Sequence, residues 1–564
     1  MADPRKPWLA SYPAGVPAEI DAHRYANLNE LFDDAVRRFG PRVAFINMLG
    51  RITYTELDRE VEAFAAFLQQ RCHLGKGHKI ALMLPNLIQY PVALFGALRA
   101  GLTVINTNPL YTARELEGQL NDSGAEAIVV IANYADHLAE IVDKTAVKHV
   151  IVTEVGDSFG FFKSALVNFA VKFVRRMVPA YSFKHAVSYR EALKTGRSLH
   201  CERPEVGYGD IAFLQYTGGT TGKPKGAMLS HGNIIANVCQ GLGMYSNVLK
   251  EGEEVLLTAI PLYHVFAMTV NCFLFVTIGG TNLLITDPRR VGDMIKDLRR
   301  HPELTIMTGV NTLFNALLNH PDFKSVNLSH LKLVIGGGAA VQSGVDERFF
   351  KRTGLHILEG YGLTECSPLC CVNPSNIRDY NGTIGLPVPS TQARIVAADG
   401  HEIWDLNEPG ELQFKGPQVM QGYYHNEKAT AQVRDGDYLL TGDIAVWQEG
   451  GYIKIIDRKK DMILVSGFNV FPSEIEDVVS RNERIVECAV IGIPSETSGE
   501  AVKLIAVRRD PSLTEKELRT WCRQYLTPYK VPRVVEFVDA LPKSAVGKVL
   551  RRCLRENGTA ASKK

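Results

Sequence analysis

The chain has 564 residues, of which 46% are hydrophobic and 22% charged, close to the usage of ordinary globular domains. This composition argues against a disordered, collagen-like or coiled-coil chain, and at about 150 residues per domain the length corresponds to roughly three or four domain-sized units. The 63 basic and 61 acidic side chains leave a net charge of only +2, so the totals give no reason to expect a nucleic-acid partner.

The N-terminal region alternates between short apolar strands and amphipathic helices from about residue 28 to residue 155. This alternation predicts right-handed βαβ units around a parallel sheet. Helices are expected at 28–39, 55–71, 91–99 and 113–120, and strands at 79–84, 103–106, 127–131 and 149–152.

The same alternation resumes after residue 205 and predicts a second α/β half. The apolar run at 265–278 is interrupted by Asn271 and is too short for a membrane span of about 20 residues, so a buried helix is expected there. The other expected helices are 232–239, 291–298 and 311–318, and the expected strands are 211–216, 254–259, 281–285, 304–307 and 331–335.

From about residue 391 short strands separated by Gly, Asp and Asn turns favour a small antiparallel barrel or sheet, and an α+β unit of about 100 residues follows from 457. The predicted fold is α/β, with a large N-terminal domain (1–457) of two doubly wound α/β subdomains plus a small β-barrel-like subdomain, and a small α+β C-terminal domain (458–564). Strands are expected at 393–397, 410–414, 452–456, 486–491 and 502–507, and helices at 473–479 and 515–524.

The ten cysteines are scattered and form no Cys-x-x-Cys pair, so a structural zinc site is not expected. Free thiols in a reducing cytosol are the simpler interpretation. The N-terminus lacks the apolar core of a signal peptide, which also favours a cytoplasmic location.

Residues 216–226 (YTGGTTGKPKG) follow an expected strand and have the composition of a phosphate-binding loop. Glycines let backbone N–H groups approach an anion, threonines add hydroxyl donors, and Lys223 and Lys225 add positive charge. The loop is not a Walker A motif, because Pro224 stands where that motif has Ser or Thr and opposes a helix at this point. A flexible surface turn is the alternative interpretation.

At this loop the sequence begins to resemble the acyl-adenylate-forming superfamily, and further motifs follow in the order of that superfamily. The resemblance is closest to bacterial long-chain fatty acid–CoA ligases, is carried further by residues 12–17, 87–99 and 308–318, and runs essentially end to end. The superfamily motifs are matched by 217–226, 360–365 (GYGLTE), 410–412 with 422–423, 441–443 (TGD), 457–461 (DRKKD) and 542–548 (PKSAVGK).

The resemblance implies that a carboxylate and ATP form acyl-AMP and pyrophosphate, and that the thiol of CoA then takes the acyl group and releases AMP. Neither step needs a protein nucleophile, since the protein has only to position two anions and offset their repulsion. Lys548 is the implied catalytic cation, and Glu365 with Thr217 the implied Mg²⁺ ligands. The implied ATP contacts are Thr217, Gly218, Gly219, Thr220, Thr221, Gly222, Lys225, Gly338, Ala339, Gly360, Tyr361, Gly362, Thr364, Asp443, Arg458 and Lys548.

Members of this superfamily rotate a mobile C-terminal domain between the two steps. The resemblance places the hinge at Lys460 or Asp461. It places Ser466, Gly467 and Phe468 beside the pantetheine arm of CoA. A hinge absorbs its change of φ and ψ at a few positions, so proline is the natural probe there.

The acyl pocket is assigned by the same resemblance to His264, Met268, Gly336 and Gly337, where small residues leave room for an extended chain. A core histidine with satisfied hydrogen bonds is the alternative for His264. Each buried CH₂ contributes about 0.8 kcal/mol, so a tail of roughly 16 carbons gains on the order of 10 kcal/mol gross. An apolar tunnel therefore selects strongly for chain length.

The segment 158–190 carries six basic residues and no acidic one, which the balanced total conceals. On a helix, Asn168, Lys172, Arg175 and Arg176 share one face, and an apolar face opposes them. A basic amphipathic helix with aromatics is typical of an anionic membrane surface, here the inner face of the cell membrane. A helix docked on the domain with solvated charges is the alternative. The apolar face comprises Phe162, Leu166, Phe169, Phe173 and Met177.

Three rival functions stay open at this point. The first is a related enzyme: a ligase that hands acyl-AMP to a carrier protein, or a medium-chain or aryl synthetase. The second is a non-catalytic fatty-acid carrier, which the ATP motifs disfavour, and the third is a P-loop kinase or GTPase, which Pro224 disfavours. A homodimer is also left open, because dimers are common among relatives.

Overall fold

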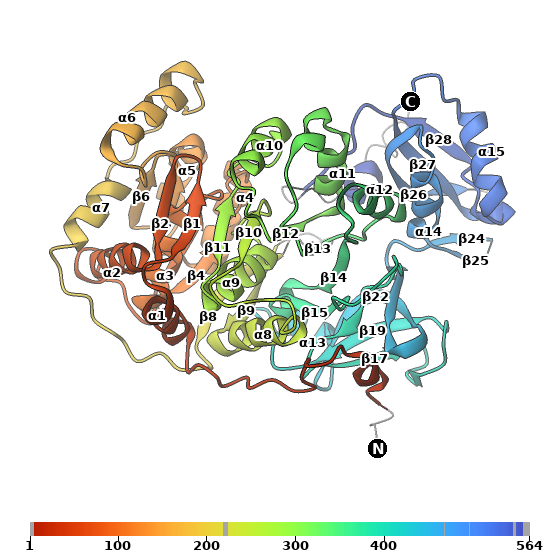
Figure 1. Cartoon of the computed structure of the whole chain (residues 1–564), viewed down its shortest axis with the longest axis horizontal. Coiled ribbons are helices and arrows are strands. Elements are labelled where there is room, and N and C mark those ends of the chain that lie inside the picture. Colours follow the sequence, from red (N-terminus) through yellow and green to blue (C-terminus); the bar gives the residue numbers. More distant parts are fainter. Residues whose placement is uncertain are drawn as a thin grey trace.

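The computed structural model describes residues 5–217, 224–466, 468–495, 497–544, 547 and 549–555, without the side chains of Phe161 and Asn469. Two large sheets with their helices form the body of the molecule, and two smaller sheets lie beside them (Figure 1). The unit that begins after residue 458 lies at the far end of the molecule from the N-terminal α/β region. This arrangement agrees with the predicted α/β fold with a large N-terminal and a small C-terminal part.

The first large sheet has eight strands in the order β20-β9-β8-β4-β3-β5-β6-β7. It is parallel from β8 to β7, and β9 and β20 add an antiparallel edge. Its strands are β3 (Lys79–Met83), β4 (Thr103–Asn106), β5 (Ala127–Ile131), β6 (His149–Thr153), β7 (Ala186–Ser188), β8 (Ile211–Thr217), β9 (Lys225–Ser230) and β20 (Gly422–Tyr423).

The second large sheet has nine strands in the order β16-β15-β14-β13-β12-β10-β11-β1-β2. It is parallel from β14 to β1. Its strands are β1 (Val43–Asn47), β2 (Gly50–Thr53), β10 (Val255–Thr258), β11 (Thr281–Leu284), β12 (Ile306–Gly309), β13 (Leu333–Gly337), β14 (Leu358–Gly362), β15 (Leu369–Val372) and β16 (Leu386–Pro387).

The division of strands between the two sheets differs from the sequence prediction. The strand expected at 211–216 was assigned to the second half, but β8 pairs with β4 in the first sheet. Conversely, β1 and β2, which the alternation did not reveal, join the second sheet through β11. An apolar strand has the same local pattern in either sheet, so its partner is decided by long-range packing.

The helices of the body agree with the predicted ones to within a few residues, and several begin at side-chain caps. Thr53 with Glu56, Thr112 with Glu115 and Ser230 with Asn233 each form a capping box, which satisfies backbone donors that a helix start leaves free. These helices are α1 (Leu28–Phe39), α2 (Tyr54–Gln70), α3 (Gln89–Arg99), α4 (Ala113–Ser123), α8 (His231–Met244), α10 (Val291–Arg300) and α11 (Asn311–Asn319). A further helix, α12 (Ser343–Thr353), was not predicted.

The apolar run at 265–278 forms the buried helix that was predicted. It consists of a π-helical stretch, η5 (Ala267–Leu274), followed by α9 (Phe275–Thr277), and every residue of both is buried. Within the described ranges, no helix is both long enough and apolar enough to cross a membrane. All ten cysteines are free thiols, as expected, and nine of them are buried.

The two smaller sheets follow in the chain. The third sheet is antiparallel, as predicted, and consists of β17 (Gln392–Val396), β18 (Glu402–Ile403), β19 (Gly410–Lys415), β21 (Arg434–Asp435), β22 (Tyr438–Trp447) and β23 (Ile453–Arg458). The fourth has its own apolar core and consists of β24 (Ile463–Val465), β25 (Phe468–Val470), β26 (Ile485–Ser495), β27 (Gly499–Arg508) and β28 (Val534–Phe537), with α14 (Pro472–Ser480) and α15 (Glu515–Tyr525).

Candidate active site

Many of the predicted site residues gather at the carboxyl ends of parallel strands in the second sheet. β13 ends at Gly337 and pairs with β14, so that Gly337 lies opposite Gly360. Val310 follows β12, and His264 lies shortly after β10. Ligands of open α/β sheets bind in the crevice outside these strand ends, so the topology favours a ligand site at this edge.

The predicted phosphate loop joins two antiparallel strands. β8 ends at Thr217, β9 begins at Lys225, and these two residues are paired across the hairpin. The predicted contacts Gly218, Gly219, Thr220, Thr221 and Gly222 lie outside the described residues. A P-loop continues from its glycines into a helix, whereas here the loop continues into a strand, so the kinase and GTPase interpretation is wrong.

The carboxylate of Glu365 lies close to the end of this hairpin. The Tyr423 hydroxyl donates to Glu365 Oε1 over 2.6 Å, and β20, which carries Tyr423, pairs with β9. Lys225 Nζ lies 5.1 Å from the centre of the Tyr423 ring. Burial and the adjacent Glu365 raise the pKa of Tyr423, so its hydroxyl stays protonated and holds the carboxylate in place. The sequence analysis had matched Tyr423 to a motif but had assigned it no role.

The donor set at Glu365 fits magnesium carried by a nucleotide. One oxygen of the carboxylate is held by Tyr423, and Thr217, the other predicted ligand, is the last residue of β8. In the part of the chain that is described, no group of three or more His, Cys, Asp or Glu side chains could hold a metal ion. Mg²⁺ usually takes one or two carboxylates and completes its shell with water and substrate phosphates, so a single carboxylate is sufficient.

Tyr361 and Asp443, predicted to contact adenine and ribose, lie next to each other. The Tyr361 hydroxyl donates to Asp443 Oδ2 over 2.5 Å, and Arg458 Nε lies 3.2 Å from Asp443 Oδ1. Burial and the neighbouring Asp443 raise the pKa of Tyr361, which keeps the hydroxyl protonated. Thr441 Oγ accepts a hydrogen bond from the backbone N–H of Asp443. The carboxylate is thus fixed as an acceptor, with Arg458 beside it.

The segment around His264 is held by a buried polar network. Asn106 on β4 donates to Gln215 on β8 over 2.9 Å, and Gln215 donates to the carbonyl of Tyr263 over 2.9 Å. Asn106 also lies 3.1 Å from Met268 Sδ, and Met268 is fully buried. These amides tie the segment to the first sheet, so both sheets position the predicted acyl pocket. The sequence offered no signal that would join residues so far apart.

The two glycines assigned to the acyl pocket have different surroundings. A Cβ atom on Gly336 would lie 2.5 Å from Val341 and 2.9 Å from Ile357, both buried core residues, so this side faces the core and leaves no room for an acyl chain. A Cβ atom on Gly337 would lie 2.9 Å from the ring of Phe266. The Cβ side of Gly336 is thus filled by the core, while Gly337 lies beside the His264 segment through Phe266.

The C-terminal lysine motif approaches this edge of the second sheet. Lys548 itself lies outside the described residues, but the carbonyl of Gly547 accepts a 3.3 Å hydrogen bond from Thr312 Oγ at the start of α11. A Cβ atom on Gly547 would lie 3.3 Å from Val310, and one on Gly338 would lie 3.7 Å from the same side chain. Val310 therefore separates the lysine motif from a glycine predicted to flank adenine.

The predicted hinge residues connect the third and fourth sheets. Burial alone would raise the pKa of Asp461, but Arg555 and Arg551 outweigh it and lower that pKa. Arg555 Nη2 lies 2.7 Å from Asp461 Oδ1, and Arg551 binds both oxygens of Glu476 over 2.7 Å. These arginines follow Lys548 in sequence, so ion pairs with Asp461 connect the predicted hinge to the segment that follows the lysine motif.

The segment predicted to bind CoA forms the turn between β24 and β25. Ser466 has a positive φ of 52°, and its N–H donates to the carbonyl of Ser498. Phe468 is 56% exposed and stacks on Tyr529 with ring centres 4.8 Å apart, while Gly467 lies outside the described residues. An exposed aromatic on this hairpin is available for contact with a long polar substrate.

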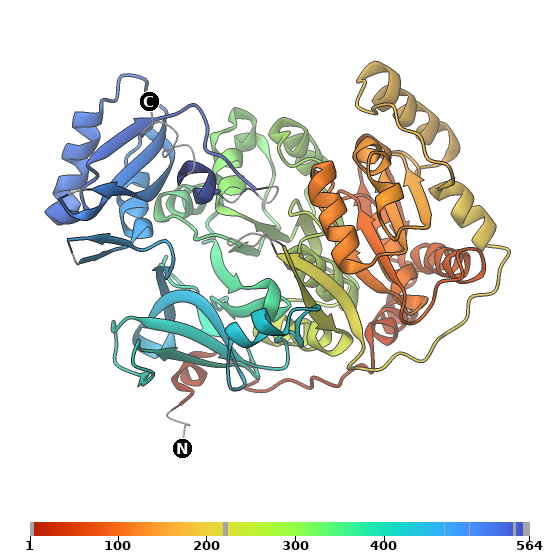
Figure 2. The same ribbon diagram turned by 180° about the vertical axis from the view of Figure 1, so that it is seen from behind.

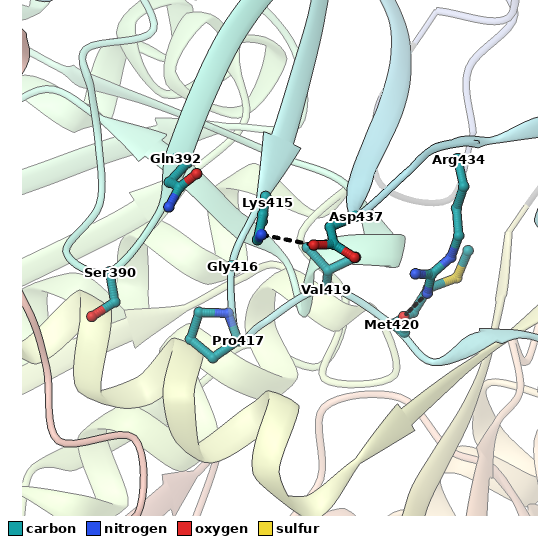
Figure 3. Close-up of a pocket in the computed structure, with 9 residues that line it drawn as sticks. All are labelled: Ser390, Gln392, Lys415, Gly416, Pro417, Val419, Met420, Arg434 and Asp437. Atoms are coloured by element: carbon teal, nitrogen blue, oxygen red, sulfur yellow. Dashed lines mark hydrogen bonds and ion pairs between the residues drawn. The ribbon is translucent and has the colours of Figure 1, made fainter. Parts of the chain in front are cut away.

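A cavity of about 370 Å³ lies on the third sheet, and its lining residue Met420 donates its backbone N–H to the carbonyl of Glu365. Figure 3 shows the Lys415–Asp437 ion pair and Arg434 on its wall. None of the predicted site residues lines this cavity. Its position gives no support to a role in the predicted reaction.

Glu359 is a partly buried acid at the site that the sequence analysis missed. It precedes Gly360, and it accepts a 3.2 Å hydrogen bond from the backbone N–H of Val341. Burial raises the pKa of Glu359 to about 8, although the Val341 N–H opposes the shift. The side chain is therefore mostly protonated at neutral pH. Nothing in the spacing of the motif distinguishes it from an exposed carboxylate.

Glu359→Gln is expected to alter the pH dependence of stability. The folded state binds the proton more tightly than the unfolded state, so this residue makes stability fall as pH rises between its ordinary value and about 8, at up to about 1.4 kcal/mol per pH unit. The glutamine variant should lose this slope. Thermal unfolding at pH 5 and pH 8 measures it, with exposed Glu347→Gln as the control. An unchanged slope would contradict the assigned pKa.

Comparisons with known proteins agree with this geometry. Residues 32–424 match the model of the AMP-binding enzyme family, and residues 474–548 match that of the AMP-binding enzyme C-terminal domain. The chain is 54% identical over 552 residues to a long-chain-fatty-acid–CoA ligase of Escherichia coli O157:H7, and 51% identical over 553 residues to that of Haemophilus influenzae, each covering 98% of both chains. Its fold matches a crystal structure of the anthranilate CoA ligase AuaEII in complex with anthranoyl-AMP, with a TM-score of 0.84 at 22% identity over 96% of this chain and 98% of that one.

Proposed function

The chain belongs to the AMP-binding enzyme family, and on this premise we propose that it is a long-chain fatty acid–CoA ligase. The observation that carries the proposal is 54% identity over 98% of both chains to a ligase of that name. In the proposed reaction a fatty-acid carboxylate oxygen attacks the α-phosphorus of ATP and pyrophosphate leaves. The sulfur of CoA then attacks the acyl carbonyl, and AMP leaves.

The proposed nucleotide site is built from two hydrogen-bonded pairs, Tyr361 with Asp443 and Tyr423 with Glu365. Tyr361 would contact adenine and Asp443 would hold the ribose hydroxyls, with Arg458 beside the carboxylate of Asp443. Lys225 and the backbone of the phosphate loop would bind the phosphates, with Thr364 near the α-phosphate. Glu365 and Thr217 would hold Mg²⁺, which would offset the negative charge of the phosphates. The ion pair between Asp443 and Arg458 and the bond from Tyr423 to Glu365 support this assignment.

The C-terminal lysine would supply the cation of the first step. Contact between Gly547 and Thr312 supports placing Lys548 at the carboxyl edge of the second sheet, where a carboxylate and an α-phosphate would meet. The domains 1–457 and 458–564, the hinge at Lys460 and Asp461, and the CoA contacts of Ser466, Gly467 and Phe468 belong to the same proposal. Rotation of the C-terminal domain about this hinge would move Lys548 away from the active site. The β24–β25 hairpin would take its place there.

A pyrophosphate-release assay over a series of straight-chain acids, with and without CoA, tests the function. We expect release that depends on ATP, Mg²⁺ and a long-chain acid, accelerated by CoA with formation of AMP and acyl-CoA. Chelation of Mg²⁺ with EDTA should abolish release. Activity with aryl or medium-chain acids but not with long-chain acids would contradict the substrate class. Formation of AMP that does not depend on CoA would contradict the proposed second step.

A further inference from the structure

One helix of the N-terminal region presents its apolar side to solvent. α6 (Phe161–Phe169) continues into a π-helical turn, η4 (Ala170–Val174), and projects beyond the edge of the first sheet (Figures 1 and 2). We call its exposed side the α6 apolar face. It comprises Phe162, Leu166, Phe169, Phe173, Val174 and Met177, with exposed fractions of 86%, 67%, 57%, 60%, 70% and 48%.

The opposite side of α6 attaches the helix to the domain through polar contacts. Asn168 accepts a 2.7 Å hydrogen bond from the N–H of Gly156 and donates to Asp157, and buried Ser164 accepts one from Arg190. The sequence analysis had grouped Asn168 with the basic face, whereas the structure shows it docked. A surface helix normally buries its apolar stripe, so this orientation is reversed and leaves the stripe for a partner.

The charge around the α6 apolar face is positive. Lys163, Lys172, Arg175 and Arg176 are all exposed, and the segment 158–190 has no acidic residue. Lys163 Nζ also donates to the carbonyl of Leu49. The turn between β1 and β2 thus adjoins the helix and adds two exposed apolar side chains, Met48 at 42% and Leu49 at 52%.

We propose that the α6 apolar face with its basic rim docks on an anionic phospholipid bilayer, the helix lying flat with its aromatic side chains in the interface. Apolar side chains flanked by Lys and Arg are the combination that binds such surfaces. A second copy of this chain is disfavoured as the occupant, because two such faces would bring their basic rims together. The bilayer supplies both the apolar phase and the negative charge.

The position of the helix also suggests how substrate is delivered, an extension that rests on the proposed function. The carbonyl of Met177, at the end of the helix, accepts a 3.0 Å hydrogen bond from Asn133. The next residue, Tyr134, packs against the same apolar core as Tyr263. Tyr263 precedes His264 at the proposed acyl pocket. The end of the helix is therefore joined to a segment that packs on the same core as the proposed acyl pocket, which would receive an acid from the bilayer.

Vesicle flotation with the full-length protein tests the docking surface. Vesicles of phosphatidylcholine with about one third phosphatidylglycerol should float the wild type, whereas pure phosphatidylcholine should float it weakly. The triple variant Lys172→Gln, Arg175→Gln, Arg176→Gln should partition on the order of 100-fold less, since each basic residue contributes about fivefold. Phe162→Ser with Phe169→Ser should also lose binding. Leu406→Ser with Tyr525→Ser removes exposed apolar side chains elsewhere and serves as the control.

The proposal would be overturned by wild-type protein that stays with the unbound fraction, or by variants of α6 that float as well as the control. Sedimentation of the same proteins identifies self-association through this face, which would also refute it. Acyl-CoA formation from an acid dispersed in detergent separates docking from the proposed function. The α6 variants should keep this activity, whereas its absence in the wild type would refute the function and leave the flotation result standing.

Discussion

Lys548→Ala is expected to lower the rate of acyl-AMP formation on the order of 10²–10³-fold, the effect of removing one positioned charge that acts in a transition state. Negative charge accumulates where the carboxylate approaches the α-phosphate, and a single ammonium can bridge both anions. Gly547, the preceding residue, bonds to Thr312 at the carboxyl edge of the second sheet, which brings the motif to this place. Acid-dependent pyrophosphate release measures the step.

The second half-reaction should be spared in the same variant. When acyl-AMP is supplied, Lys548→Ala should form acyl-CoA at close to the wild-type rate, because thiol attack needs no cation between two anions. Lys543→Ala is a matched control from the same motif, since Lys543 is paired with Glu487 over 2.7 Å. Should pyrophosphate release survive in Lys548→Ala, or fall equally in Lys543→Ala, the catalytic assignment would be wrong.

Lys460→Pro is expected to have the complementary effect: adenylation persists, while transfer to CoA falls by about 100-fold, the cost of misplaced reacting groups. The turn is held by the N–H groups of Asp461 and Met462, which both donate to the carbonyl of Arg458. Proline at 460 removes neither donor. It fixes φ at about −65° and restricts the conformation of Lys459 before it, so rotation about this turn is hindered.

Separate assays of the two half-reactions measure this effect. Lys460→Ala is the control, because it removes the same side chain but leaves the backbone free, and it should retain both activities. Parallel loss of both half-reactions in the proline variant would place the hinge elsewhere or indicate misfolding. Thermal unfolding distinguishes those two, since a folded variant should melt close to the wild type.

Much of the local architecture was readable from the sequence because it depends on short-range chemistry. The predicted strand at 103–106 and helix at 28–39 coincide with β4 and α1, since apolar periodicity and caps act within one element. Pro224 correctly opposed a helix after the phosphate loop, because proline lacks the N–H that a helix interior needs. Such signals are carried by neighbouring residues and survive without knowledge of the fold.

Contacts between distant segments could not be predicted in the same way. The bond between Tyr423 and Glu365, the pair Tyr361–Asp443 and the core environment of Gly336 each join segments that have no common local pattern. The raised pKa of Glu359 is of the same kind, because burial is a property of what packs around a side chain.

The sequence by itself determined the class of chemistry, because the order of six motifs and the residue types within them specify which anions must be held. The near-neutral total charge excluded few functions. The basic run at 158–190 was the only feature of the sequence that indicated binding to a membrane surface. Only the tertiary structure decided which side of that run faces outward. Docking through Ser164 and Asn168 turns the aromatic side chains to solvent, and helical periodicity alone defines two faces without saying which of them the domain covers.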